Sequence, residues 1–96
     1  MIIVTAHVWL WSEGRGRWHF LTVPPEQAVE IRLEALGACR GFGSVRVLAR
    51  IREVEWRTSV FPERQSGGYI LPIRAEVRAQ AGIAAGDEVE VTVDLV

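Results

Sequence analysis

Alternation of apolar and polar residues with a period of two recurs along this chain, and it restricts the possible folds more than any other feature. The first such segment covers residues 2–11, and the last covers residues 88–95, where valine alternates with acidic residues and threonine. Such alternation is typical of a strand with one buried face. The same pattern, or a short apolar run bounded by turn residues, predicts further strands at residues 17–23, 45–51, 54–60 and 69–71. The sequence therefore predicts a mainly β protein.

Two short helices are predicted between the strands. Pro25 suits the first position of a helix and Gly37 its end, so residues 25–36 form the first helix. Residues 73–81, closed by Gly82, form the second. The buried stripe predicted for the first helix consists of Val29, Leu33 and Leu36, widened by Ala28, Ile31 and Ala35. Residues 61–68, with a proline and a Gly-Gly pair, are predicted as a loop.

The length of 96 residues allows one domain over residues 1–96. Hydrophobic residues make up 49% of the chain and charged residues 24%, which is the balance of a packed protein. The longest segment without charge, residues 1–12, is shorter than the roughly 20 apolar residues that span a bilayer, and it lacks the features of a signal peptide. The single Cys39 cannot form an intrachain disulfide, as expected in a reducing compartment. We expect a cytoplasmic protein without membrane contact.

Four aromatic residues of the first two strands are predicted to share one face. A hairpin that pairs Trp11 with Trp18 places Trp9 opposite Phe20. The favoured interpretation is a core or barrel-end cluster, because aromatic side chains supply much of the buried area of small domains. A ligand-stacking platform is the alternative.

A second hairpin is predicted around Arg52 and Glu53. A two-residue turn there pairs Ala49 with Trp56 on an apolar face, where Trp56 is expected to be buried. The turn lacks the glycine or asparagine that such turns usually contain.

The order strand, proline, helix, glycine, strand occurs twice, in residues 18–51 and 69–96. This repetition predicts two similar units related by a pseudo-twofold axis, joined by a strand from Glu53 to Phe61 and the loop that follows it. The second unit carries Tyr69-Ile70-Leu71-Pro72, Val77-Arg78, Ala81-Gly82-Ile83 and Gly86-Asp87-Glu88-Val89-Glu90-Val91. These residues resemble the swapped-hairpin element of AbrB and MazE proteins, in which each of two chains supplies one unit.

A broader resemblance covers nearly the whole chain. It is carried by Val8-Trp9, Trp18, Phe20, Pro24, Gly41-Phe42-Gly43-Ser44-Val45, Trp56-Arg57-Thr58-Ser59-Val60-Phe61-Pro62, Gly68-Tyr69-Ile70-Leu71-Pro72, Val77-Arg78, Gly82-Ile83 and Gly86-Asp87. On these residues the chain resembles the small domain-of-unknown-function family nineteen-oh-five, whose members are sometimes joined to a YdeI/OmpD-associated module that is not expected here. The resemblance implies a double-split β-barrel of six to seven strands capped by two short helices, and it implies no activity.

Motifs for catalysis or for cofactor binding are not evident in the sequence. Gly41-Phe42-Gly43 precedes a predicted strand, whereas a dinucleotide-binding turn opens a helix. A Ser-His-Asp set can be drawn from Ser59, either His7 or His19, and Asp87, but most small proteins offer such combinations. We therefore expect no enzyme activity, no cofactor and no metal site.

The AbrB-like half suggests DNA binding as an alternative function. Arg46, Arg50, Arg52 and Arg57 are the arginines of the second hairpin that could form a basic face. Glu53 and Glu55 lie among them, and the net charge of the chain is −1. Since a clustered positive surface is the usual footprint of a nucleic-acid binder, nucleic acid is not the expected partner.

A small binding or interaction module, monomeric or weakly dimeric, is the function that remains. Its partner is expected to be a small ligand or a protein. The candidate site combines Ser59, Tyr69 and Arg74 in a shallow pocket for a carboxylate or phosphate group, because arginine at the start of a helix adds positive charge to the positive end of the helix dipole. The alternative is that Arg74 pairs with a glutamate such as Glu76.

Overall fold

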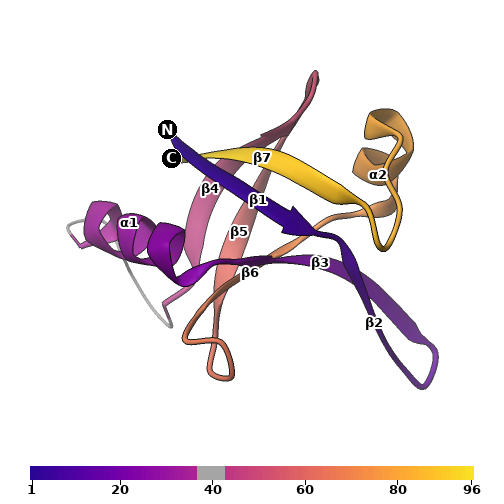
Figure 1. Ribbon diagram of the computed structural model, residues 1–96, viewed down its shortest axis with the longest axis horizontal. Coiled ribbons are helices and arrows are strands. Elements are labelled where there is room, and N and C mark those ends of the chain that lie inside the picture. Colours follow the sequence, from indigo (N-terminus) through magenta and orange to yellow (C-terminus); the bar gives the residue numbers. More distant parts are fainter. Residues whose placement is uncertain (37–42) are drawn as a thin grey trace.

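The computed structural model describes residues 1–36 and 43–96, which form seven strands and two helices (Figure 1). In chain order these are β1 (Ile2–His7), β2 (Trp9–Glu13), β3 (Gly16–Val23), α1 (Pro25–Ala35), β4 (Val45–Ile51), β5 (Val54–Glu63), β6 (Gly68–Pro72), α2 (Ala75–Ala81) and β7 (Glu88–Leu95). The predicted mainly β class, with seven strands and two helices, is confirmed. None of the helices in these residues is both long enough and apolar enough to cross a membrane.

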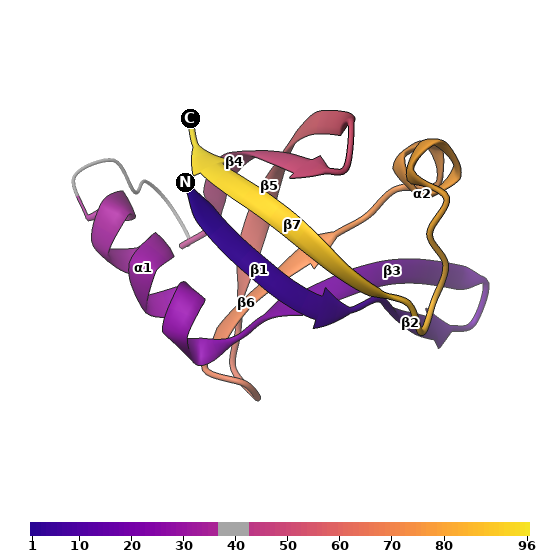
Figure 2. The same cartoon turned by 45° about the horizontal axis from the view of Figure 1, so that its top comes forward.

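The strands form one curled antiparallel sheet in the order β1-β7-β4-β5-β6-β3-β2, which bends into a half-barrel (Figure 2). Its two outermost strands, β1 and β2, are consecutive in the chain. The sheet therefore curls far enough for one continuous segment to reach both of its ends.

That segment, residues 2–13, is not the single strand that the alternation predicts. It breaks at Val8, whose N–H donates to the carbonyl of Asp87 at 2.9 Å and whose carbonyl accepts from the N–H of Gly86 at 2.7 Å. Before the break, β1 pairs with β7, and after it β2 pairs with β3. Alternation of apolar and polar residues indicates which face of a strand is buried, but not which neighbouring strand it pairs with. The change of pairing partner at Val8 could therefore not be predicted from this pattern.

Strand β5 makes a similar change of partner. Its first residues, up to Val60, pair with β4, while Phe61, Pro62 and Glu63 pair with β6. The prediction of a loop at residues 61–68 is therefore wrong, since only residues 64–67 form the turn. Among the described residues, none pairs with the β4 side of β5 beyond Val60, which is the kind of edge position where proline is tolerated.

The pairings contain the internal repeat that the sequence predicts. Strand β3 pairs with β6, and β4 pairs with β7. The segment formed by β1 and β2 pairs with β7 and then with β3, just as β5 pairs with β4 and then with β6. Strand β5, which was expected only to join the two units, is therefore the first element of the second unit.

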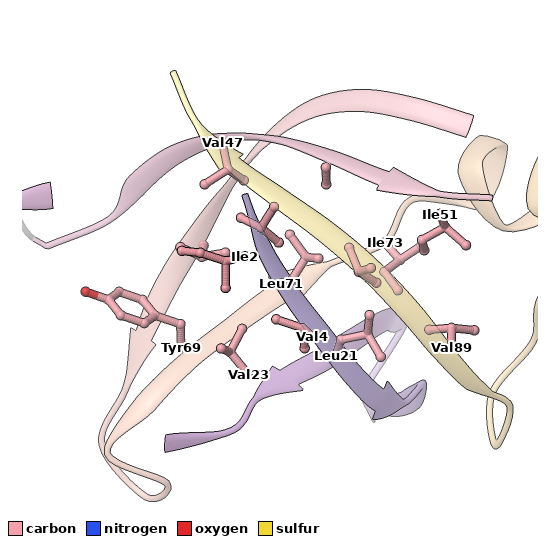
Figure 3. Packing of buried hydrophobic residues seen from close by; sticks show 14 of the residues in the cluster. Ile2, Val4, Leu21, Val23, Val47, Ile51, Tyr69, Leu71, Ile73 and Val89 are labelled. Atoms are coloured by element: carbon pink, nitrogen blue, oxygen red, sulfur yellow. The ribbon is translucent and has the colours of Figure 1, made fainter. Parts of the chain in front are cut away.

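The core lies on the concave side of the sheet (Figure 3). Alternate residues of β4 and β7 point into it, as predicted from their sequences. The predicted register of the second hairpin is confirmed throughout, including the pairing of Ala49 with Trp56, and the Trp56 side chain is 7% exposed.

Helix α1 buries a different face from the one predicted. Ala28, Ile31 and Ala35 are buried, whereas the expected inner stripe of Val29, Leu33 and Leu36 is exposed. The cause is a close approach to Gly68 of β6, where an added Cβ would lie 3.3 Å from the Cβ of Ala28. Only a small residue fits on the helix at this contact. The contact between Ala28 and Gly68 therefore determines which face of α1 turns toward the sheet. The prediction that Gly37 closes the helix falls outside the described residues.

The turn of the second hairpin is held by its own arginine. Arg52 has a φ of 55°, a left-handed conformation that is unfavourable for a residue other than glycine. Its Nη1 donates to the carbonyl of Ala81 at 2.7 Å, at the end of α2. The turn without glycine is thus hydrogen-bonded to the last turn of α2.

The first prediction concerns Trp56. Because its side chain is buried, Trp56→Ala is expected to lower the free energy of unfolding by about 3 to 5 kcal/mol, most of the stability of a domain of this size. Trp18→Ala is the matched control, with an expected loss of under about 1 kcal/mol because this side chain is 54% exposed. Chemical denaturation measures both losses, and similar values for the two variants would contradict the core described above.

The second prediction concerns Arg52. Arg52→Ala keeps the left-handed backbone and loses the hydrogen bond to Ala81, with an expected cost of about 1 kcal/mol. Arg52→Gly loses the same bond but relieves the backbone, so it should be more stable than the alanine variant by up to about 1 kcal/mol. Thermal unfolding would show this order, and the reverse order would mean that the turn is not strained.

Candidate functional site

The outer face of the half-sheet formed by β2, β3, β6 and the end of β5 gathers most of the aromatic side chains of the chain. The register is the predicted one, with Trp11 paired with Trp18 and Trp9 with Phe20. Strand β6 continues the same face, because Phe20 pairs with Pro72 and Ile70 pairs with Phe61. Side chains from both repeats therefore meet on this surface, which we call the aromatic face.

The aromatic face is not part of the core. Trp18 is 54% exposed, Phe61 43% and Trp11 41%, while Trp9 and Phe20 are half-buried. The favoured interpretation of a core cluster is therefore wrong, because the aromatic side chains lie on the convex side of the sheet, away from the buried residues. The geometry matches the alternative, a platform open to solvent.

The aromatic face encloses an open cleft of about 760 Å³. It is lined by Trp9, Trp11, Trp18, Phe20, Phe61, Glu63, Gln65, Ile70 and Pro72. Two contacts hold its floor: Trp9 Nε1 donates to Thr22 Oγ1 at 2.9 Å, and the rings of Trp9 and Phe20 lie 5.0 Å apart at an angle of 36°. These contacts fix both rings before any ligand arrives.

The site predicted from the sequence does not assemble. Tyr69 is 5% exposed and lies with the buried cluster (Figure 3), where the guanidinium of Arg32 is 5.8 Å from its ring centre. Tyr69 pairs with Pro62, three residues after Ser59, so strand alternation places Ser59 on the opposite face of the sheet from Tyr69.

Arg74 precedes α2 and donates from Nη2 to the carbonyl of Arg57 at 3.2 Å, rather than to a glutamate. Ser59, Tyr69 and Arg74 therefore do not line one pocket.

The sequence predicts the shared face of the four aromatic residues of β2 and β3 that line the cleft, but not the contribution of the end of β5. Glu63 was not expected in a strand, because residues 61–68 were predicted as a loop. The available signal was the alternation of β5, which continues through Pro62 with Phe61 and Glu63 on one face.

The outer face of the other half-sheet carries charges of both signs. The cleft on this face, of about 340 Å³, is lined by Met1, Leu48, Arg50, Arg52, Glu55, Glu90, Thr92 and Asp94. Arg50 and Glu55 are cross-strand neighbours as predicted, yet Arg50 Nε donates to the carbonyl of Arg52 at 2.8 Å. Acidic side chains of β7 thus lie beside the arginines that were considered for DNA binding.

The residues of the hypothetical catalytic triad are engaged in separate contacts. Ser59 pairs with Arg46 across the sheet, His19 contacts Arg78, and Asp87 Oδ2 accepts from the N–H of Ala84 at 2.9 Å. Within residues 1–36 and 43–96, no three histidine, cysteine, aspartate or glutamate side chains lie close enough together to hold a metal ion.

A half-buried pair of His19 and Arg78 lies on the other face of the β2–β3 hairpin. Arg78 Nη1 lies 3.0 Å from His19 Nε2. Because a guanidinium only donates, Nε2 must accept and the ring proton must be on Nδ1. Both His19 Nδ1 and Arg78 Nε are buried without a partner among the described groups. Burial first, then the charges of Arg78 and Arg17, lower the pKa of His19 below its usual value of 6.5.

The third prediction follows from this pKa. Below pH 6.5 the His19 imidazole takes up a proton in the unfolded chain. In the folded chain it stays neutral until the pH reaches its lower pKa. The free energy of unfolding should therefore be highest well above pH 6.5 and fall as the pH drops through 6.5, until the lower pKa of His19 in the folded chain is reached. His19→Gln should flatten this dependence, whereas His7→Gln, at an exposed position, should preserve it. An unchanged slope in the His19 variant would contradict the assignment.

Comparison with protein families found one match, which covers most of the chain. No curated protein sequence matches the chain. The model of a family described as Domain of unknown function (DUF1905) matches residues 5–93, which include every strand from β2 to β6, both helices, half of β1 and most of β7. The chain therefore belongs to the DUF1905 family.

Proposed function

We propose that this protein is a small binding module that holds a ligand with a flat or compact apolar part in the cleft of the aromatic face. The observation that carries the proposal is the exposure of Trp11, Trp18 and Phe61 around a single cleft. Contiguous exposed apolar surface is disfavoured in a soluble protein and marks sites of interaction.

The size and construction of the cleft support a small ligand. A volume of about 760 Å³ falls in the range of small-molecule sites, which are mostly apolar with few polar groups. The lining residues project from hydrogen-bonded strands, and only Gln65 comes from a turn. A rigid support of this kind reduces the entropy lost on binding.

Two other ligand classes receive less support from the geometry. DNA binding would need a continuous basic surface, but acidic residues of β7 share the arginine-bearing face. A small anion would need a cation in the site, but Arg74 is held by the carbonyl of Arg57 and does not line the aromatic cleft.

The fourth prediction tests the cleft with indole as the probe. Indole at millimolar concentration should shift the NMR signals of the indole N–H groups of Trp11 and Trp18 while leaving that of the buried Trp56 in place. Trp18→Ala should weaken the binding of indole by about tenfold, the loss expected for one stacking contact.

Leu33→Ala is the matched control, because it removes an exposed apolar side chain from α1, away from the aromatic face. If indole moves no cleft signal, or if Leu33→Ala weakens binding as much as Trp18→Ala, the cleft is not the binding site.

A further inference from the structure

The charge and the ring geometry of the cleft point to one chemical class of ligand. Building on the proposed function, we propose that the cleft recognises a small organic cation whose positive group is an alkylated ammonium. Such a group has an apolar surface and a delocalised charge, so it can leave water more readily than a bare ammonium.

The lining of the cleft favours a positive charge. Five aromatic side chains line it, and the π face of such a ring carries the negative part of the ring quadrupole and attracts a cation within about 6 Å of the ring centre. Glu63 is the only charged side chain among the described residues that line the cleft. The site therefore offers a carboxylate and aromatic faces together.

The hydrogen bond of Trp9 determines which part of its ring is available. The indole N–H is the electropositive edge of the ring, and it is engaged by Thr22 Oγ1 at 2.9 Å. That bond turns the donor toward β3 and fixes the ring against Phe20, 5.0 Å away. The N–H edge, which would repel a cation, is thus satisfied within the protein.

The carboxylate of Glu63 is available to a ligand. Glu63 pairs with Gly68 at the end of β5 and is half-buried, on the same face as Phe61. In the described part of the chain, no arginine lies within 4.0 Å of its carboxylate. Arg32, near the turn that follows Glu63, donates to the carbonyl of Gly67 instead.

The fifth prediction compares two molecules of the same shape. Choline and 3,3-dimethyl-1-butanol differ only in the replacement of the quaternary nitrogen by carbon, so their difference in affinity isolates the effect of charge. In an NMR titration of the tryptophan indole signals, choline should bind about tenfold more tightly than the neutral alcohol.

Glu63→Gln should weaken choline binding by about fivefold and leave the binding of the neutral alcohol unchanged. Glu34→Gln removes the same charge from the exposed face of α1 and should change neither affinity. Because Glu63 is not in the core, the variant is expected to fold, and its unshifted Trp56 signal would confirm that it does.

The outcomes separate this inference from the function on which it depends. Equal affinity for the two molecules, or an effect of Glu63→Gln on both, would overturn the choice of a cation while leaving an apolar binding cleft. Binding of indole without any binding of choline would do the same. If neither indole nor choline shifts a cleft signal, the proposed function and the inference both fail.

Discussion

Two backbone hydrogen bonds at Val8 determine how the rest of the molecule is arranged. They join the chain to Gly86 and Asp87, just before β7, at the point where the first segment leaves one half of the sheet for the other. Without this crossing, β1 and β2 would continue as one strand and could pair with only one neighbour on each side. With it, β1 covers the core beside β7, and β2 extends beside β3 as the free edge. The aromatic face exists because β2 lies beside β3 at this end of the sheet, where Trp9 and Trp11 face its convex side.

The internal repeat explains why a cleft forms there. If the two units are aligned at the residues that precede their helices, Pro24 and Arg74, then Phe20 corresponds to Ile70 and Trp9 to Phe61. By the same register Trp11 corresponds to Glu63, and Trp18 corresponds to Gly68. The β2–β3 hairpin therefore carries two tryptophans at the positions where the β5–β6 hairpin carries the carboxylate of Glu63 and the glycine Gly68. The two hairpins therefore contribute unequally to the lining of the cleft, with three tryptophans from β2 and β3 and one carboxylate from β5.

The sequence was sufficient where a residue's position depends on its near neighbours. The hairpin register of Ala49 and Trp56 and the end of α2 at Gly82, which adopts a left-handed conformation, were all predicted. It was insufficient where distant contacts decide. The break at Val8 depends on Gly86 and Asp87, just before β7, and the rotation of α1 depends on Gly68, far along the chain.

The aromatic residues of β2 and β3 were correctly predicted to share one face, but whether that face is buried or exposed depends on how the whole sheet curls. The proposed pocket of Ser59, Tyr69 and Arg74 did not form because β5 continues through Pro62, which fixes Tyr69 on the core side.

Gly68 determines how closely α1 packs against β6. An added Cβ there would lie 2.9 Å from the carbonyl oxygen of Val23 and 3.3 Å from Ala28, so no larger residue fits without moving the chain where α1 begins. Gly68 does not line the aromatic cleft, so this close approach sets the face that the helix buries without shaping the cleft. The cleft residues themselves lie outside the core, so they can change the chemistry of binding with little effect on the packing that positions them.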